Sequence, residues 1–218
     1  MSEFAKPAER VKNALDTRKL HLSTRCPADN TKWSSFTWLI VASNPRLVVW
    51  TNDPGDTGEV NNYGKIVANF DIMSFTVFLQ LLGEVIDHSG ERKESIETYN
   101  YIFPRGVKSE TPVLVSTLYF GKDKDGIIWV SLVAKNRPVI KFVFGENEFH
   151  HYINGDGTPA DKSKTSQRYA RAYIKILYDV MEQLLVSTYV APPPPENKQG
   201  GYKTTYNNNN TVEADLPF

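Results

Sequence analysis

The sequence has very little cysteine and no long apolar run. Its 218 residues include a single cysteine, Cys26, so no internal disulfide can form and nothing indicates an oxidising compartment. No apolar run approaches the ~20 residues that a membrane-spanning helix needs. The N-terminal residues mix charges throughout and lack the apolar core of a signal peptide. We therefore expect a cytoplasmic protein without a membrane partner.

Net charge is also missing, because 25 basic side chains balance 25 acidic ones. A neutral total argues at first against a nucleic-acid binder, but the charge is unevenly distributed. Residues 1–32 carry seven basic and four acidic side chains, and residues 135–175 carry eight and four. Residues 71–110 instead carry seven acidic and four basic side chains. Two basic segments are therefore hidden in the total, and nucleic acid is not excluded.

The composition does provide a core. Hydrophobic residues make up 40% of the chain and aromatic residues 12%, which excludes a disordered protein, a coiled coil and a small disulfide scaffold. The composition changes near Val190, where four consecutive prolines, a Gly-Gly pair and four consecutive asparagines follow. Too few large apolar residues remain there to offset the entropy of ordering. We predict a folded body over residues 1–190 and a disordered, flexible tail over residues 191–218.

Two long helices are expected from apolar residues at three- and four-residue spacing. The first contains Phe75, Phe78 and Leu82, with Asp71 as its cap, and the second runs from about Tyr169 to Leu184. Apolar and β-branched runs predict strands around them. These predicted strands span residues 20–25, 36–43, 46–53, 64–70, 112–120, 126–134, 138–144 and, more weakly, 149–153.

The two halves of the body can be superimposed. Asn44 precedes the first helix by the same 29 residues that separate Asn136 from the second. In each half a tryptophan also precedes an alanine, Trp38 before Ala42 and Trp129 before Ala134. The two spacings differ by one residue, which we assign to a bulge. The sequence thus predicts an α+β protein with repeats at about 18–90 and 111–190. Each repeat is strand-strand-strand-strand-helix, and the antiparallel sheets pack against the two helices.

This double pattern resembles the Whirly fold of single-stranded-DNA-binding proteins. Each half is similar to the related transcriptional coactivator domain, and the resemblance covers most of residues 18–190 in element order and spacing. It implies a pseudo-dimeric body that binds single strands. A helix face is the expected surface for any further self-association into a homo-oligomer.

A second resemblance concerns the end of the sequence. Glu213 precedes Asp215, Leu216, Pro217 and Phe218, which resemble the acidic tip of bacterial single-stranded-DNA-binding proteins (SSB). In that family the terminal phenylalanine and its carboxylate enter an apolar pocket with basic residues on replication and repair enzymes. The resemblance implies a partner-binding tip. Because the body does not look like the usual SSB barrel, it also points to a bacteriophage protein acting with host partners in the bacterial cytoplasm.

Binding to single-stranded DNA requires aromatic side chains for base stacking and cations along the backbone. Alternation along residues 126–135 places Ile128, Val130 and Leu132 on one face of a strand and Trp129 and Lys135 on the other. The same argument, with Trp38 added by analogy with Trp129, gives the outer faces of the other strands. The expected nucleic-acid-binding residues are Trp38, Arg46, Trp50, Lys65, Trp129, Lys135, Arg137 and Lys141.

No arrangement of residues indicates catalysis, a metal site or a cofactor, so we expect a protein that is not an enzyme. His150 and His151 would point to opposite faces of a strand, which does not suit a shared metal. The acidic residues at 84, 87, 91, 94 and 97 could be taken for a nuclease cluster. We interpret them as the solvated end of the first helix and the loop after it.

The sequence therefore predicts a single-stranded-DNA-binding protein of replication, recombination or repair. One alternative keeps this function on an OB barrel, although two long helices argue against that fold. A transcription or RNA-binding cofactor and a protein-interaction module without nucleic-acid binding also remain open.

Overall fold

The computed structural model describes residues 13–17, 20–41, 43–56, 64–102, 106–187 and 189 of the chain. After a short 3-10 helix at Ala14–Asp16, the elements follow as four strands, a helix, four more strands and a second helix. The eight strands in this part of the chain form two antiparallel four-stranded sheets. The predicted α+β class is therefore confirmed. The tail predicted at 191–218 lies outside the described residues.

The first sheet, sheet A, has its strands in chain order. It consists of β1 (Leu22–Arg25), β2 (Trp33–Val41), β3 (Asn44–Trp50) and β4 (Lys65–Asn69). All four predicted strands of the first half are present, and each pairs antiparallel with its chain neighbour. Because such neighbours need only short connections, the apolar runs and turns of the sequence were sufficient to predict this sheet.

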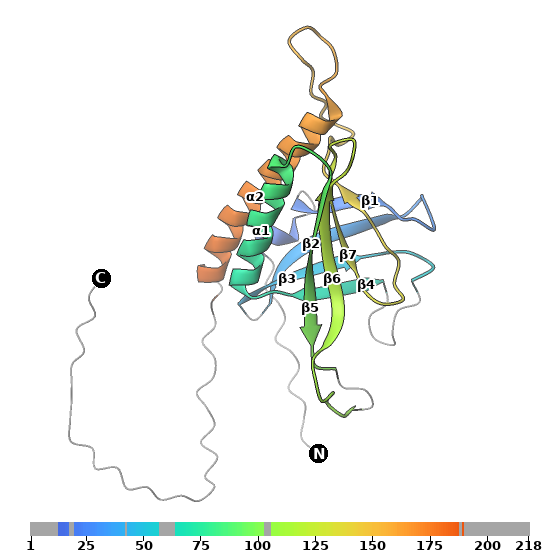
Figure 1. Cartoon of the computed structure of the whole chain (residues 1–218), viewed down its shortest axis with the longest axis vertical. Helices are drawn as coiled ribbons and strands as arrows, with labels where there is room; N and C mark the ends of the chain where they lie inside the picture. The colour runs from blue at the N-terminus through green and yellow to red at the C-terminus, as the bar shows by residue number, and fades with distance from the viewer. Residues whose placement is uncertain are drawn as a thin grey trace, which may run out of the picture.

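The second sheet, sheet B, also has its strands in chain order, and it crosses sheet A at a large angle (Figure 1). It consists of β5 (Arg92–Asn100), β6 (Val113–Lys122), β7 (Ile128–Val133) and β8 (Phe142–Val143). Its third and fourth strands, β7 and β8, fall inside the predicted ranges 126–134 and 138–144. Its first strand does not correspond to any predicted strand.

Strand β5 corrects the interpretation of the acidic segment after the first helix. Glu94 and Glu97 were expected in a loop, but both lie in β5, at the edge of sheet B. Arg92 joins Glu94 to the helix, since its guanidinium donates to Glu94 at 2.8 Å and to Glu84 at 3.1 Å. Charged residues are common on edge strands because they prevent pairing with another chain. In β5 these charged residues replace the apolar ones by which a strand is recognised in the sequence.

The prediction of a weak strand at 149–153 is wrong. This segment forms only two isolated bridges, Asn147 with His150 and Ile153 with Pro159. Glu146 holds the loop, because its carboxylate accepts the Tyr152 N–H at 2.9 Å and lies 3.1 Å from His151 Nδ1. The second half still has four strands before its helix, as predicted. The first of these strands is β5, which lies outside the predicted repeat of 111–190.

Two α-helices, α1 (Ile72–Asp87) and α2 (Lys162–Ser187), lie side by side on one side of the sheets (Figure 1). Both agree with the predicted apolar periodicity, which buries one stripe of each helix. Asp71 caps α1 as predicted, with Oδ1 accepting the Ser74 N–H at 2.8 Å. Neither of these helices has the length and apolarity needed to cross a membrane.

The opposite end of α1 is closed by a lysine from sheet B. Lys122 Nζ donates to the carbonyl of Ile86 at 2.7 Å and to the carbonyl of His88. These carbonyls lie at the helix C-terminus, which carries partial negative charge. Burial lowers the pKa of the Lys122 ammonium. The lysine thereby fixes α1 to β6.

One apolar core joins both sheets and both helices. Phe36 of sheet A lies 5.6 Å from Phe142 of sheet B, measured between ring centroids, and Phe78 of α1 lies 5.3 Å from Phe120 of β6. The inner rows predicted by alternation, including Leu47 and Val49 on β3 and Ile128, Val130 and Leu132 on β7, are buried. The outer face of sheet A is also buried in its middle, at Thr37 and Val48, so the surface left for binding is the end of this sheet that carries Trp33 and Trp50.

Candidate nucleic-acid interface

The outer face of sheet A carries an exposed tryptophan beneath a lysine. Trp50 is the last residue of β3 and is 42% exposed. Its direct cross-strand partner is Lys65, the first residue of β4, whose Nζ lies 5.2 Å from the Trp50 ring centroid. Directly paired residues share a face of the sheet, so the register itself brings these two predicted site residues together. A cation at this distance from an indole ring is attracted by its π-electrons.

A second cation–tryptophan pair on the same face was missed by the sequence prediction. Trp33 opens β2 and is 49% exposed, and its cross-strand partner Arg25 lies over it at 4.0 Å from the ring centroid. Trp33 shares a face with Ser35, which pairs directly with Trp50. The two tryptophans are therefore diagonal neighbours, a separation of about 7–8 Å. We call Arg25, Trp33, Trp50 and Lys65 the Trp50 cluster.

Trp33 was missed because the predicted strand began at Phe36. The alternation extends back three residues to Trp33, with Ser34 buried and Ser35 on the outer face. Serines usually bound strands, so Ser34 and Ser35 did not indicate that the strand extends further. The signal that could have found Trp33 is its alternation with Phe36, since a strand from 33 would place the two residues on opposite faces.

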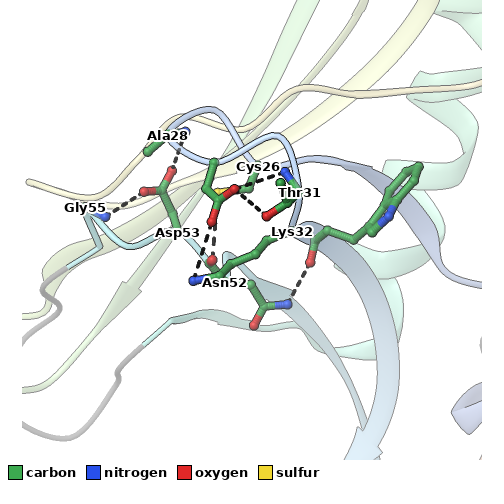
Figure 2. Close-up of polar contacts among 9 residues, drawn as sticks. Cys26, Ala28, Thr31, Lys32, Asn52, Asp53 and Gly55 are labelled. Atoms are coloured by element: carbon green, nitrogen blue, oxygen red, sulfur yellow. Dashed lines mark hydrogen bonds and ion pairs between the residues drawn. The ribbon is translucent and has the colours of Figure 1, made fainter.

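Two loops at this end of sheet A are bound to each other, as Figure 2 shows. The Asn52 side chain donates to the Trp33 carbonyl at 2.7 Å, and the Cys26 thiol lies 3.7 Å from the Asn52 carbonyl. Asp53 accepts the Ala28 N–H at 3.4 Å and the Gly55 N–H at 2.7 Å. The loop of residues 26–32, which joins β1 to β2, is thus held against residues 51–55 after β3. The tryptophans that flank these loops are held with them.

The first of these loops is closed by its own carboxylate. Asp29 accepts the Thr31 hydroxyl at 2.6 Å and the Thr31 N–H at 3.0 Å, and it pairs with Lys32 at 3.6 Å (Figure 2). The hydroxyl and N–H of Thr31 lower the pKa of the Asp29 carboxyl, and Lys32 adds to this. These bonds favour the ionised Asp29 carboxylate, which keeps the loop closed next to the Trp50 cluster.

Arg137 was predicted to contact nucleic acid, and the structure contradicts this. Its guanidinium Nε and Nη2 both donate to the Asp56 carboxylate, the second at 2.7 Å. The Arg137 side chain is 8% exposed and that of Asp56 is fully buried. A buried bidentate pair leaves no free face for a phosphate. The partners lie 81 residues apart in the chain, which is why the sequence did not reveal the pair.

Trp38 was also predicted on the outer face, and this prediction is wrong. Trp38 is 2% exposed and packs edge-on against Phe70 and Phe75, with ring centroids 5.2 and 4.8 Å away. The analogy with Trp129 failed because the two tryptophans differ by one residue in their distance from the following alanine. A shift of one residue moves a side chain to the other face of a strand.

Trp129 does lie on the outer face of sheet B, together with Lys141. Lys141 Nζ is 4.8 Å from the Trp129 ring centroid and 3.6 Å from Asp123. The indole lies against Gly121, its direct partner on β6, where an added Cβ would come within 3.0 Å of the ring. Glycine therefore provides the space that the half-buried indole occupies.

The same face of sheet B carries one further pair that the sequence prediction missed. Lys93 Nζ lies 4.1 Å from the ring centroid of Tyr119. Lys93, Gly121 and Trp129 follow one another across β5, β6 and β7, so they share a face. We call Lys93, Tyr119, Trp129 and Lys141 the Trp129 cluster. Lys93 was missed because β5 was not recognised as a strand.

The remaining predicted residues have different positions. Arg46 lies on the outer face of sheet A, where its Nε donates to Asn69 at 2.7 Å. Lys135 is exposed in the turn after β7. The tip, Asp215 to Phe218, lies outside the described residues. Of the eight predicted binding residues, the structure therefore brings Trp50 together with Lys65 and Trp129 together with Lys141. Trp38 and Arg137 are buried and are removed from the candidate site.

A cavity of about 600 Å³ adjoins the Trp50 cluster. Its lining includes Trp33, Val143, Phe149 and Tyr173, from both sheets, the loop after β8 and α2. Burial raises the pKa of the Tyr173 hydroxyl far above its ordinary value.

Among the described residues, no three or more His, Cys, Asp or Glu side chains are grouped so as to hold a metal ion.

Comparison with protein-family models, with curated proteins and with solved structures finds no match to this chain.

Proposed function

We propose that this protein binds single-stranded DNA, without catalysing a reaction, through the Trp50 cluster and the Trp129 cluster. Proteins that bind single strands combine aromatic side chains, on which bases stack, with cations that follow the phosphates. The observation that carries the proposal is the pairing of cations with tryptophans on strand faces: Arg25 with Trp33, Lys65 with Trp50 and Lys141 with Trp129.

The geometry favours a single strand over a duplex. Trp33 and Trp50 present partly exposed rings on a sheet face, where an unpaired base can stack and its phosphate can meet Arg25 or Lys65. In a duplex the faces of the bases are already stacked on one another. Because the chain has no net charge, long-range attraction of the phosphates is weak, and stacking has to supply more of the affinity.

We propose that the biological role is to coat exposed strands during replication, recombination or repair. The order of four strands and a helix, present twice, supports a Whirly-like arrangement of the two halves. Lys135, exposed in the turn after β7, and Arg46 on sheet A are proposed as further phosphate contacts.

The second part of the proposal concerns Asp215 to Phe218, which we expect to recruit replication or repair enzymes. Leu216 and Phe218 supply apolar anchors, and Asp215 and Glu213 supply charge for a basic rim on the partner. The resemblance of these residues to the SSB tip, on a body that does not look like the usual SSB barrel, supports a bacteriophage origin and action in the bacterial cytoplasm.

The deciding experiment is a tryptophan-fluorescence titration with oligo-dT, duplex DNA and an RNA oligonucleotide at two salt concentrations. We expect preference for oligo-dT and loss of affinity with added salt. Equal binding of RNA and DNA would favour an RNA-binding or transcription cofactor. No binding to any of the three at low salt would contradict the proposal and favour a protein-interaction module.

A further inference from the structure

A buried polar network lies behind the Trp50 cluster. Ser34 follows Trp33 and Thr51 follows Trp50, so their side chains point to the opposite face of the sheet from the two indoles. Ser34 Oγ donates to the Thr51 carbonyl at 2.5 Å, and the Thr51 N–H donates to the Gly64 carbonyl at 2.7 Å. These bonds connect the backbone beside Trp33, Trp50 and Lys65.

The network ends on Arg137, in the turn that follows β7 of the other sheet. Thr51 Oγ1 donates to the Asp56 carboxylate at 2.5 Å, and the same carboxylate receives both donors of Arg137. Arg137 Nη2 also donates to the Lys65 carbonyl at 3.1 Å. Arg137 therefore reaches from the turn after β7 to the backbone of the residue whose ammonium lies over Trp50.

We infer that Arg137 is a positioning residue, which fixes the Trp50–Lys65 pair through Asp56 and the Lys65 carbonyl without touching the nucleic acid. The inference rests on the proposed function and extends it, because strand binding by sheet A then depends on a turn of sheet B. The planar guanidinium can donate to a carboxylate and a carbonyl at once, and these fixed donors hold the Lys65 backbone in one place.

The main test replaces the ion pair by neutral amides, as Asp56→Asn with Arg137→Gln, so that no buried charge is left without its partner. Oligo-dT affinity is measured by fluorescence anisotropy across a range of salt concentrations. We expect a loss of about fivefold or more, with the slope of log affinity against log salt unchanged. A direct phosphate contact would instead lower that slope by about 0.7, and this outcome would overturn the inference.

A matched control uses an exposed ion pair on α2. Lys175 and Asp179 lie 2.9 Å apart, far from either cluster in the sequence, and Asp179→Asn with Lys175→Gln makes the same chemical change. We expect unchanged affinity. In a Trp50→Ala, Lys65→Ala background, the change at Asp56 and Arg137 should have no further effect. An undiminished effect there would show that Arg137 acts elsewhere, contrary to the inference.

A readout without DNA separates this inference from the proposed function. The indole N–H resonances of the four tryptophans are recorded by NMR, with that of Trp50 assigned from Trp50→Phe. The Asp56→Asn, Arg137→Gln variant should shift the Trp50 resonance and leave that of Trp129 in place. An unmoved Trp50 resonance overturns the inference, whereas absent DNA binding by the wild type overturns the proposed function alone. If the double variant does not fold, Arg137→Lys is used, with the same expected direction.

Discussion

Lys65 lies over the indole of Trp50, and the two residues are direct partners across β3 and β4. The pair is thus built by the register of the two strands. The Lys65 carbonyl is held by Arg137, and the residue after Trp50 is held by Asp56. A surface that is fixed before its ligand arrives loses less entropy on binding. This is the physical reason for placing the centre of the proposed interface here.

Replacing Trp50 by alanine should weaken oligo-dT binding by about 1–3 kcal/mol, because one base loses its stacking partner. Every 1.4 kcal/mol is about a tenfold change in the dissociation constant, so fluorescence anisotropy can measure the loss. Trp33→Ala should have an effect of similar size. The double variant should lose about the sum if the two rings hold separate bases, and less than the sum if they hold one.

Tyr178 provides the control for this prediction. It is an exposed aromatic residue on α2, 51% exposed, and belongs to neither cluster. Tyr178→Ala should leave affinity unchanged. If it weakens binding as much as Trp50→Ala does, the nucleic acid does not recognise the outer face of sheet A specifically.

The sheets and the core were largely predictable from the sequence, because strand alternation has a fixed period of two. Ile128, Val130 and Leu132 are buried as that period requires, and the helix stripes follow from the period of 3.6. The errors lie at residues whose position the periodicity of apolar residues does not predict. Strand β5 was missed because its charged residues belong to an edge, and Trp38 was placed on the wrong face by an analogy displaced by one residue.

The candidate site was less predictable, since it depends on contacts between distant segments. Trp50 and Lys65 were chosen separately, and only the register of β3 with β4 showed them to be partners. Arg137 has the same formal charge as a residue that contacts phosphate, so the sequence did not set it apart. It is buried because it pairs with Asp56, a residue of the other half. The sequence contains the residue types, but burial and pairing are decided by how the two sheets pack.

The salt dependence of binding should identify the cations that contact phosphates. Lys65→Ala and Lys141→Ala should each reduce the slope of log affinity against log salt by about 0.7, the value for one contact on a single strand. Lys175→Ala, on the exposed face of α2, should leave the slope unchanged. An unaltered slope in both cluster variants would mean that these lysines only support the indole rings.

Removal of Phe218 should separate the two proposed activities. Affinity for oligo-dT should stay equal or rise, because the tip without its aromatic anchor competes less well with DNA for basic side chains. Capture of replication and repair enzymes from a defined mixture should be lost, as measured by co-purification with the full chain as reference. Loss of DNA binding in the shortened chain would contradict this division of labour.

The cap of α1 gives a prediction for pH. Bonds from the Ser74 N–H and hydroxyl lower the pKa of the Asp71 carboxyl, so the carboxylate is preferred in the folded state. Its contribution is present above the ordinary pKa of aspartate and is lost as pH falls through the lowered value. Asp71→Ala should cost about 1 kcal/mol of unfolding free energy at neutral pH, as for other N-caps. In urea unfolding at several pH values, the difference from wild type should shrink in acid, whereas Asp71→Asn should show a smaller and flatter difference.

Trp129 tests whether the outer face of sheet B belongs to the same interface. Its indole rests on Gly121 and beneath Lys141, so one base can stack only on the part of the ring that these neighbours leave exposed. Trp129→Ala should therefore weaken oligo-dT binding by about 1–3 kcal/mol, while Trp129→Phe, which keeps an aromatic face, should recover much of the affinity. Both variants are compared with wild type by anisotropy after circular dichroism has shown that they fold. Full affinity in a folded Trp129→Ala variant would confine the interface to sheet A, and Lys93 and Tyr119 would be removed from it at the same time, because they share the face of Trp129.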